Sequence, residues 1–244
     1  MLICITTKCL MECSHCMMEA SSEGEHMAPD TFNKTLAFIK QFNLPIMPIL
    51  VSGGEPTLNP HWEVFIERLL NENYKPCLLS NGMWLDDEDI CQKMTEFMKK
   101  GLLVQVTHIK ELYPKKINYK KAKEMGIRIE KELQTMVKAG RAKKNNITYH
   151  TYRKSPFCFN PRSISKNVNN LSEVIGMLMN KGKFCTPFIM PNGEVKFGEM
   201  LTCYILGSVT DKFETIFNNL RNMSCGKCGL YKNLSPMHLA AIEK

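Results

Sequence analysis

Long hydrophobic runs are missing from the sequence. No apolar run approaches the roughly 20 residues needed to cross a bilayer, so we predict no membrane span. The first residues lack a charged start, a long apolar stretch and a small-residue cleavage site, so we predict no secretory signal. Internal repeats, low-complexity tracts and long linkers are absent as well. These absences leave a cytoplasmic globular protein as the expectation.

Cysteine is abundant, but its pattern does not predict a disulfide framework. The eleven cysteines are an odd number and cluster at spacings typical of metal ligands. In a chain without a secretory signal, such cysteines indicate ligands and a reducing compartment. At 244 residues, with 44% apolar and 23% charged residues, the chain is expected to bury a large core.

The first cysteine group follows the apolar opening at residues 1–5. Cys9, Cys13 and Cys16 are separated by three and then two residues on one predicted loop. Three such thiolates can bind three irons of a cubane and leave the fourth iron open, whereas iron–sulfur clusters normally take four cysteines. An open ligand position is what separates catalytic from structural zinc sites. Cys4 offers another interpretation, a four-cysteine zinc site with these three.

Strand and helix patterns alternate through the first half of the chain. Apolar runs predict strands at 1–5, 46–51, 76–79 and 102–107, and helical spacing predicts helices from Pro29, over 62–70 and over 86–98. This alternation implies right-handed crossovers and a parallel sheet with helices outside, closed as a barrel or partial barrel. The later pattern is weaker: a helix over 118–125, a strand or charged helix over 127–137, and a strand over 147–152.

The second predicted strand runs directly into Ser52-Gly53-Gly54-Glu55-Pro56. Two adjacent glycines after a parallel strand let the backbone approach a ligand closely, at the carboxyl edge where α/β sheets and barrels place their sites. Glu55 would then accept a hydrogen bond from a cationic amine. A purely structural turn explains these residues equally well.

A second cysteine group occupies the C-terminal part of the chain, at Cys185, Cys203, Cys225 and Cys228. Runs at 186–190 and 194–197 flank Pro191-Asn192-Gly193, which predicts a hairpin because Asn-Gly supplies the positive φ angles of a tight turn. The hairpin would bring Cys203 back toward Cys185, and the last pair would complete a four-thiolate site. A structural zinc ribbon suits the same four cysteines.

The cysteine loop after one strand and the Gly-Gly-Glu turn after the next together resemble the radical S-adenosylmethionine (radical SAM) superfamily. The resemblance implies a partial (β/α)6 TIM-like barrel over residues 1–165. It also implies a 4Fe–4S cluster on Cys9, Cys13 and Cys16 whose open iron takes the amino and carboxylate groups of S-adenosylmethionine (SAM). The SAM contacts that it suggests are His15, Ser52, Gly53, Gly54, Glu55, Ser80, Asn81 and Thr107, with His108 as the alternative to Thr107.

The C-terminal cysteines, with Gly198 between them, are similar to the SPASM and twitch regions that carry auxiliary clusters in many radical SAM enzymes. This implies a small hairpin-containing region over 166–244, with a second 4Fe–4S cluster on Cys185, Cys203, Cys225 and Cys228. A fully ligated cluster would accept the electron left on a substrate radical, which points to net oxidation. Cys158 and Arg162 are the catalytic candidates, with a merely buried Cys158 as the alternative. Arg141 and Arg162 are candidates for holding an anionic substrate group, or exposed structural residues.

The resemblance implies an oxidoreductase that cleaves SAM to a 5′-deoxyadenosyl radical, with flavodoxin or ferredoxin as reductant. We expect a peptide or protein side chain as substrate. The alternatives are a small alcohol or amino-cyclitol, and a nucleotide or nucleic acid. The nucleic-acid alternative rests on residues 110–144, whose twelve basic and four acidic residues account for the whole formal charge of +8. A solvated face explains that segment as well, and a zinc-stabilised binding module is the non-enzymatic alternative.

Overall fold

The computed structural model describes residues 1–41, 48–131, 140–147, 187–197 and 205–222. In the N-terminal part the strands are β1 (Leu2–Thr6), β2 (Pro48–Gly53), β3 (Lys75–Ser80), β4 (Leu103–Thr107) and β5 (Ile129–Glu130). The helices are α1 (Pro29–Lys40), α2 (Trp62–Asn71), α3 (Glu88–Lys99), α4 (Tyr119–Glu124) and α5 (Gly140–Lys144), with short 3₁₀ turns η1 (Pro56–Leu58) and η2 (Met83–Asp86). The C-terminal elements are β6 (Pro187–Ile189), β7 (Glu194–Phe197), β8 (Ile205–Ser208) and α8 (Phe213–Asn222).

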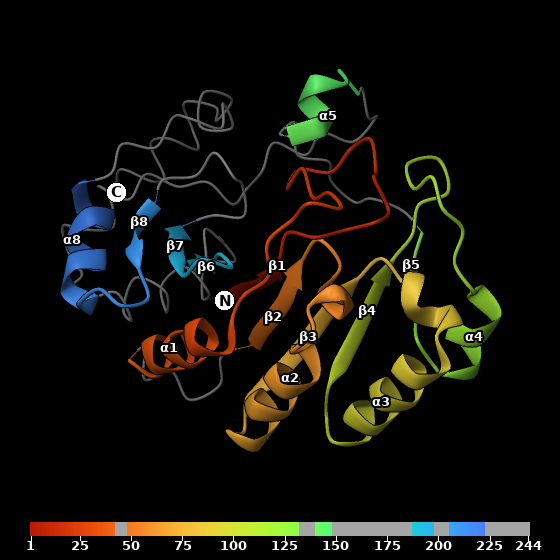
Figure 1. The fold of residues 1–244 in the computed structure, drawn as a ribbon, viewed down its shortest axis with the longest axis horizontal. Coiled ribbons are helices and arrows are strands. Elements are labelled where there is room, and N and C mark those ends of the chain that lie inside the picture. Colours follow the sequence, from red (N-terminus) through yellow and green to blue (C-terminus); the bar gives the residue numbers. More distant parts are fainter. Residues whose placement is uncertain (42–47, 132–139, 148–186, 198–204, 223–244) are drawn as a thin grey trace, which may run out of the picture.

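The described strands form one eight-stranded sheet in the order β5-β4-β3-β2-β1-β6-β7-β8 (Figure 1). The strands from β5 to β6 are parallel to one another, and β7 and β8 extend the sheet in antiparallel fashion. The predicted α/β class with a mainly parallel sheet is therefore confirmed. Among the described strands, β5 and β8 lie at the two edges of this sheet, and the predicted closure into a partial barrel stays a prediction.

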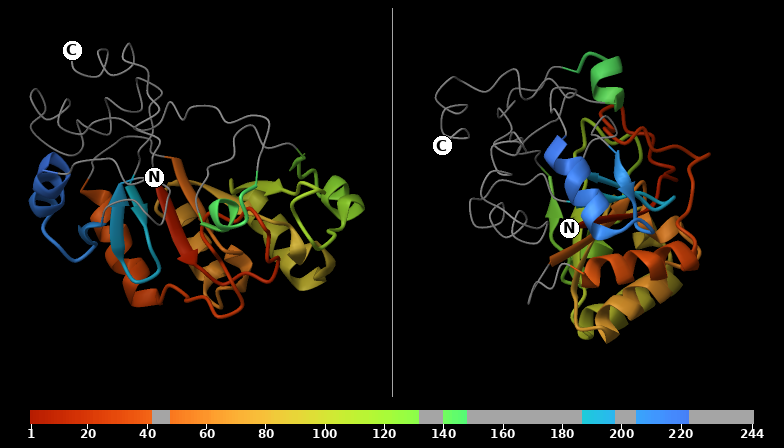
Figure 2. Two further views of the ribbon diagram at one scale, coloured as in Figure 1. Left: turned by 90° about the horizontal axis from the view of Figure 1, so that it is seen from above. Right: turned by 90° about the vertical axis from the view of Figure 1, so that its left-hand side faces the viewer.

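Side chains alternate between the two faces of the sheet, as strand geometry requires. Ile3, Val51 and Leu78 pack with the buried residues of α1, α2 and α3 in one hydrophobic core. Figure 2 shows these three helices together on one side of the sheet. The opposite face carries a second, smaller cluster that includes Cys4 and Phe188. The helix layer thus leaves the carboxyl edge of the parallel strands free for a site.

The start of α3 differs slightly from the prediction. Asp86 ends the turn η2, and the helix begins at Glu88 because the Asp87 carboxylate caps it by accepting from the Ile90 N–H at 3.0 Å. Hydrophobic spacing alone does not show which of the two adjacent aspartates, Asp86 or Asp87, caps the helix.

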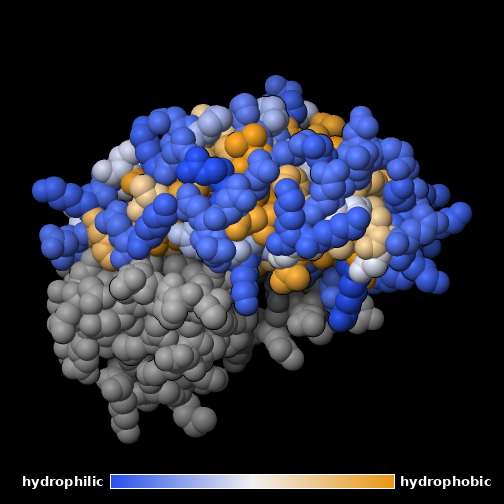
Figure 3. Space-filling view, turned by 90° about the horizontal axis from the view of Figure 1, so that it is seen from below, coloured by the Kyte–Doolittle hydropathy of each residue, from blue (hydrophilic) through white to orange (hydrophobic). Residues whose placement is uncertain are grey.

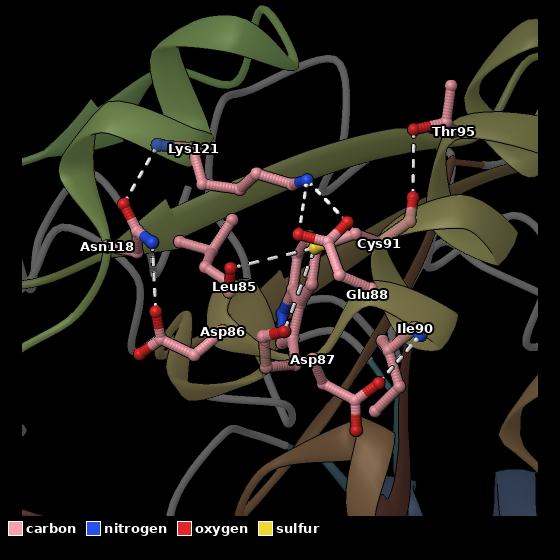
Figure 4. A network of polar contacts seen from close by, with 10 residues as sticks. Leu85, Asp86, Asp87, Glu88, Ile90, Cys91, Thr95, Asn118 and Lys121 are labelled. Atoms are coloured by element: carbon pink, nitrogen blue, oxygen red, sulfur yellow. Dashed lines mark hydrogen bonds and ion pairs between the residues drawn. The ribbon is translucent and has the colours of Figure 1, made fainter.

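Helix α4 is tied to the start of α3 by polar contacts (Figure 4). The Lys121 ammonium lies 2.7 Å from Glu88, and the Asn118 amide donates to Asp86 at 2.9 Å. The Cys91 thiol of α3 lies 3.7 Å from the Leu85 carbonyl. The predicted helix over 118–125 is confirmed. Of the strand or charged helix predicted over 127–137, the structure describes residues 127–131, which contain the short strand β5.

The predicted C-terminal hairpin is confirmed, but it continues the main sheet. Strands β6 and β7 pair antiparallel, and Gly193 takes the positive φ of +86° that the turn needs. Strand β6 also pairs in parallel with β1, with Leu2 opposite Phe188. The predicted boundary at 165/166 lies outside the described residues and stays a prediction.

The face in Figure 3 is covered mostly by hydrophilic side chains, with smaller hydrophobic areas between them. The most exposed large apolar side chains belong to separate elements: Leu10, Val64, Leu103, Tyr119 and Ile205. No helix in the described part of the chain is long and apolar enough to cross a bilayer.

Candidate functional site

The three N-terminal cysteines lie on the loop of residues 7–28 between β1 and α1, which we call the cluster loop. Cys9 and Cys13 are buried and Cys16 is half-buried. The Met11 N–H and the Asn81 amide approach the Cys9 sulfur at 3.4 and 3.5 Å. Burial raises the pKa of Cys9 and raises that of Cys13 to about 12. The bare thiols of Cys9 and Cys13 therefore keep their protons at neutral pH, and a bound cationic group is needed to hold these two as thiolates.

The three cysteines of the cluster loop suit an iron–sulfur cluster better than a single metal ion. Within the described residues, no three His, Cys, Asp or Glu side chains are close enough to share one metal ion. Cys4 packs with Leu2 and Phe188 in the sheet, and its thiol donates to the Thr6 carbonyl at 3.3 Å. These residues thus give no support to the four-cysteine zinc alternative. A cubane asks only that each thiolate reach its own iron.

The Gly-Gly-Glu turn is joined to the cluster loop by main-chain hydrogen bonds. The Gly54 N–H donates to the Thr6 carbonyl at 2.7 Å, and the Glu55 N–H donates to the Lys8 carbonyl at 2.8 Å. A Cβ on Gly53 would overlap the Thr6 carbonyl, and one on Gly54 would overlap the Lys8 carbonyl. The close neighbour that these glycines permit is thus the cluster loop itself, where the sequence led us to expect a ligand.

The Glu55 carboxylate is buried within a polar network that the sequence predicted in part. Ser80 donates to it at 3.0 Å, the Asn81 N–H at 2.8 Å and the Thr57 hydroxyl at 2.9 Å. Burial raises the pKa of Glu55, and these hydrogen bonds oppose the rise. Because Asn81 also contacts Cys9, the network connects the ends of β2 and β3 to the cluster loop.

Thr107 and His108, the alternative SAM contacts predicted at the end of β4, have different surroundings. Thr107 is half-buried, and among the described residues neither its hydroxyl nor that of Ser52 makes a hydrogen bond. His108 is a buried core residue whose Nε2 lies 2.8 Å from the Lys115 carbonyl and whose Nδ1 lies 2.7 Å from the Tyr119 hydroxyl. A carbonyl can only accept, so we assign the proton to Nε2 and the acceptor role to Nδ1. His108 therefore orders the segment after β4.

His15 contacts this same segment. Its ring lies 5.2 Å from that of Tyr113, which lies 5.1 Å from that of His108. Burial lowers the pKa of His15, and its Nδ1 is buried without a partner among the described residues. No sequence pattern singled out Tyr113, because a lone tyrosine on a loop carries no spacing signal.

Helix α5 is the other feature that the sequence did not predict, and it lies over the cluster loop (Figure 1). The Arg141 Nε donates to the Cys13 carbonyl at 2.8 Å, and its Nη1 donates to the Ala20 carbonyl at 2.9 Å. The Arg141 N–H donates to the Cys16 carbonyl at 3.0 Å. Arg141 therefore braces the cluster loop, a role that the sequence did not suggest, and it is half-buried, not exposed. Its Nη2 is buried and has no partner.

The remaining predicted site residues lie outside the described ranges. They are Cys158, Arg162, Cys185, Cys203, Cys225 and Cys228. Their roles stay predictions.

A cysteine loop and a buried acidic network at the carboxyl edge of a mainly parallel sheet define an iron–sulfur enzyme on an α/β scaffold. The chain belongs to the radical SAM superfamily, whose family model matches residues 3–152. Enzymes of this family use a 4Fe–4S cluster and SAM.

Solved structures share the fold. BtrN in complex with AdoMet and 2-DOIA matches with a TM-score of 0.57 and 12% identity, over 100% of this chain and 94% of that chain. Native anSMEcpe with bound AdoMet and the Cp18Cys peptide matches with a TM-score of 0.55 and 16% identity, over 99% and 87%. SuiB of Streptococcus suis bound to S-adenosylmethionine matches with a TM-score of 0.52 and 13% identity, over 95% and 68%.

Two curated relatives match shorter stretches. A probable GTP 3′,8-cyclase of Methanococcus vannielii is 31% identical over 116 residues, which is 46% of this chain and 36% of that protein. An S-adenosylmethionine-dependent nucleotide dehydratase of a Thermoplasmatales archaeon is 29% identical over 81 residues, 33% of this chain and 28% of that protein. The chain thus spans about a third of the length of these relatives.

Proposed function

We propose that this enzyme cleaves SAM reductively at a cluster held by Cys9, Cys13 and Cys16, and uses the resulting radical to oxidise a C–H bond of a peptide or protein side chain. The proposal of SAM cleavage rests mainly on the hydrogen bonds that join the Gly-Gly-Glu turn to the cluster loop. These bonds bring the buried Glu55 carboxylate to the same edge of the sheet as the loop that carries the thiols of Cys9, Cys13 and Cys16.

The residues present fit the cluster and cosubstrate. His15 Nδ1 and Arg141 Nη2 are buried polar atoms without partners, and such atoms are expected to hydrogen-bond a bound group. Glu55 would hold the cosubstrate's ammonium, Arg141 would face its carboxylate, and His15 would lie beside its adenine or the cluster. When bound, the cluster supplies the one electron that breaks the cosubstrate's carbon–sulfur bond. The chain orients the cosubstrate and keeps water from it.

We also propose a second, auxiliary cluster on Cys185, Cys203, Cys225 and Cys228. Its support is topological: β6 and β8 both run antiparallel to β7, so both begin at the same edge of the sheet. Cys185 precedes β6 by two residues and Cys203 precedes β8 by two. Each residue spans at most about 3.6 Å, so both thiols are within reach of that edge. Helix α8 ends three residues before Cys225.

The substrate class is supported by the strand face opposite the helices. The positions that alternate with the core residues there are Leu50 and Ser52 on β2, Cys77 and Leu79 on β3, and Leu103, Gln105 and Thr107 on β4. Toward the carboxyl edge these positions are uncharged, whereas the same face carries Lys75 at the amino end of β3 and Lys196 on β7, opposite Phe188. An uncharged side chain of a peptide, or a small alcohol, suits the carboxyl ends of β2 to β4 better than a phosphorylated nucleotide. The named ligands of anSMEcpe and BtrN, a peptide and 2-DOIA, match these two classes.

The proposed reductant is flavodoxin or ferredoxin. Lys110, Lys115 and Lys116 are exposed, and none pairs with a carboxylate. They flank Tyr113, which contacts the cluster loop, so they offer positive charge to an acidic donor near the cluster.

The test of SAM cleavage compares two variants. The Cys9→Ala/Cys13→Ala/Cys16→Ala protein should form no 5′-deoxyadenosine from SAM and dithionite, while its auxiliary cluster still assembles. Cys77→Ala, which removes a half-buried thiol from β3, should cleave SAM like the wild type. Retained cleavage by the triple variant would falsify the assignment.

The auxiliary cluster has its own test. Anaerobically reconstituted protein should contain about eight irons and eight sulfides per chain. Cys225→Ala/Cys228→Ala should halve the iron and keep SAM cleavage but lose substrate oxidation. About four irons and one zinc in the wild type would instead make the C-terminal site structural.

A further inference from the structure

A buried tryptophan is joined to the Glu55 network through Ser80. Trp84 belongs to η2, is 4% exposed and donates its indole N–H to the Ser80 hydroxyl oxygen at 2.8 Å. The Gly82 N–H donates to the same oxygen at 2.9 Å, and the chain turns between Ser80 and Trp84 at Gly82, whose φ is +81°. A buried indole N–H usually finds an acceptor, and here the acceptor is a residue of the proposed SAM site.

The contacts from Trp84 and Gly82 fix the direction of the Ser80 proton. A hydroxyl has one proton to donate and two lone pairs with which to accept, and its proton rotates to suit its partners. Indole and main-chain N–H groups only donate, so Trp84 and Gly82 occupy both lone pairs. The single proton is left for the Glu55 carboxylate, whose two oxygens each lie 3.0 Å from Ser80 Oγ. Ser80 is therefore a donor in one fixed direction.

The other groups that contact the Glu55 carboxylate also donate to it. They are the Asn81 N–H at 2.8 Å, and the Thr57 hydroxyl and N–H at 2.9 and 3.4 Å. A protonated Glu55 would need an acceptor, and of the two hydroxyls around it only that of Thr57 is free to turn. A buried carboxylate surrounded by donors is favoured in its ionised form. The network thus holds a negative charge in a buried position, where an ammonium group can pair with it.

Trp62 provides an internal comparison. It is the other of the two tryptophans of the chain, is likewise 4% exposed, and lies on α2 with its ring edge-on to that of Phe97 at 5.8 Å. Both indoles belong to the same hydrophobic core. Among the described residues, only the Trp84 side chain is joined by a hydrogen bond to a residue that contacts Glu55. Loss of the indole should therefore affect the core in both cases and the site in one.

We propose that Trp84 is a positioning residue that directs the Ser80 proton toward Glu55 and so keeps this carboxylate an acceptor for the ammonium of SAM. This inference rests on the proposed function. A phenylalanine in place of Trp84 keeps an aromatic ring in the core but frees one lone pair of Ser80. The Ser80 hydroxyl can then turn away from Glu55 or accept from its protonated form, and either change weakens the acceptor.

The test is a double-mutant cycle on the reconstituted protein, with SAM affinity measured by titration calorimetry. Trp84→Phe should bind SAM about fivefold more weakly, since one hydrogen bond of the network is lost. In the Ser80→Ala background the same substitution should change the affinity by less than about twofold, because the group through which Trp84 acts is already absent. Trp62→Phe should lower the midpoint of urea unfolding, as Trp84→Phe does, but leave the SAM affinity unchanged.

The two tryptophans also give a readout that does not depend on SAM. Full-length protein with isotopically labelled tryptophan nitrogen should show two indole N–H signals in its nuclear magnetic resonance spectrum, assigned with Trp62→Phe. Ser80→Ala should shift the Trp84 signal upfield, because the indole loses its acceptor, and leave the Trp62 signal in place. An unmoved Trp84 signal would show that the indole does not depend on Ser80 and would overturn the inference.

Three results of the affinity measurements would also overturn it. Wild-type affinity in Trp84→Phe would make the indole a core residue whose N–H Ser80 merely satisfies. An equal loss with and without the Ser80 hydroxyl would show that the ring acts through packing. Wild-type affinity in Ser80→Ala, which leaves the core rings intact, would decide the matter even if Trp84→Phe assembled no cluster. A wild type that assembles its cluster but does not bind SAM would instead overturn the proposed function, and this inference with it.

Discussion

The cluster loop is held on two sides by different means. On one side the Gly53–Glu55 turn donates main-chain N–H groups to Thr6 and Lys8, at 2.7 and 2.8 Å. On the other side α5 and the residue after it donate mainly side-chain groups, from Arg141 to Cys13 and Ala20 and from Asn145 to Ser14. Both sides engage main-chain carbonyls of the cluster loop, and the first side also engages Thr6 at the end of β1.

The difference lies in what each attachment requires of the sequence. Main-chain donors reach the loop only if no Cβ intervenes, so that side demands glycine at two successive positions. Side-chain donors act over a longer reach and can be replaced at smaller cost. We therefore expect even a small substitution in the Gly53–Glu55 turn to destabilise the loop strongly. Substitutions in and after α5 should each weaken its attachment by a smaller amount, and the following predictions test this contrast.

The largest effect is expected from Gly54→Ala. The new Cβ would meet the Lys8 carbonyl and the Cys9 Cβ, and main chain cannot shift easily. We expect the free energy of unfolding of the apoprotein to fall by about 3 kcal/mol and most of the iron to be lost on reconstitution. Urea unfolding and iron content measure these effects.

The matched control is Gly126→Ala. Gly126 has a positive φ of +72° but nothing within 4 Å of its added Cβ, so only backbone strain of about 1 kcal/mol is expected. If both alanine variants lost the same stability and kept their iron, the close approach of turn and loop would not matter.

Arg141→Met should have the next largest effect. The substitution keeps an apolar stem but removes the guanidinium donors to the carbonyls of Cys13 and Ala20, at a cost of about 2 kcal/mol. Among the described residues, the Cys13 carbonyl keeps only the Cys16 N–H, at 3.2 Å. Iron release to a chelator should be up to roughly thirtyfold faster than in the wild type at that cost. Arg141→Lys should recover little, because one ammonium cannot reproduce the guanidinium's fork. Wild-type iron retention in Arg141→Met would contradict bracing by α5.

The pH dependence of SAM binding separates the two sides. Burial raises the pKa of Glu55 above its ordinary value, so the carboxylate loses its charge at a higher pH than an exposed glutamate. As the pH falls through that raised pKa, affinity for the cosubstrate's ammonium should fall as well. Glu55→Gln should bind more weakly at neutral pH and lose this dependence. Arg141→Met should keep it, and calorimetry across pH distinguishes the two.

The smallest effects belong to the exposed end of α5. Asn145→Ala removes one hydrogen bond of 2.8 Å to the Ser14 carbonyl and should cost about 0.5–1 kcal/mol. Lys144→Ala removes an ion pair of 2.7 Å with Glu19, and because the lysine is 67% exposed the cost should stay below about 0.5 kcal/mol. A larger loss from Lys144→Ala than from Arg141→Met, both measured by urea unfolding, would reverse the proposed order.

The same contrast explains what could be predicted from the sequence. Strands β1 to β4, the cysteine loop and the turn at Glu55 were predicted because each leaves a local mark: apolar runs, a fixed cysteine spacing, and two glycines directly after a strand. The family resemblance suggested Ser80 and Asn81 beside them. These marks need only neighbouring residues, since parallel strands bring their carboxyl ends to one edge.

Arg141 and Tyr113 left no such mark. Arg141 reaches Cys13 across 128 residues, and its charge is indistinguishable in sequence from the lysines around it. Tyr113 gains its meaning from His15 and His108, which meet only in the folded chain. Strand β8 and helix α8 were also missed. The pairing of β6 with β1 could not be predicted either, because the turn sequence of a hairpin indicates only that its own two strands pair.

The pairing of β1 with both β2 and β6 has a consequence for how the protein is made. Strand β1 is synthesised first and lies in the interior of the sheet, yet one of its neighbours is β6, at Pro187–Ile189. Between completion of β2 at Gly53 and arrival of β6, a ribosome adding about 5–20 residues per second needs roughly 7–27 s. During that time the side of β1 that β6 will occupy lacks its final partner. The nascent chain therefore carries an open strand edge beside the cysteines of the cluster loop, and this interval is when pairing with other chains has to be prevented.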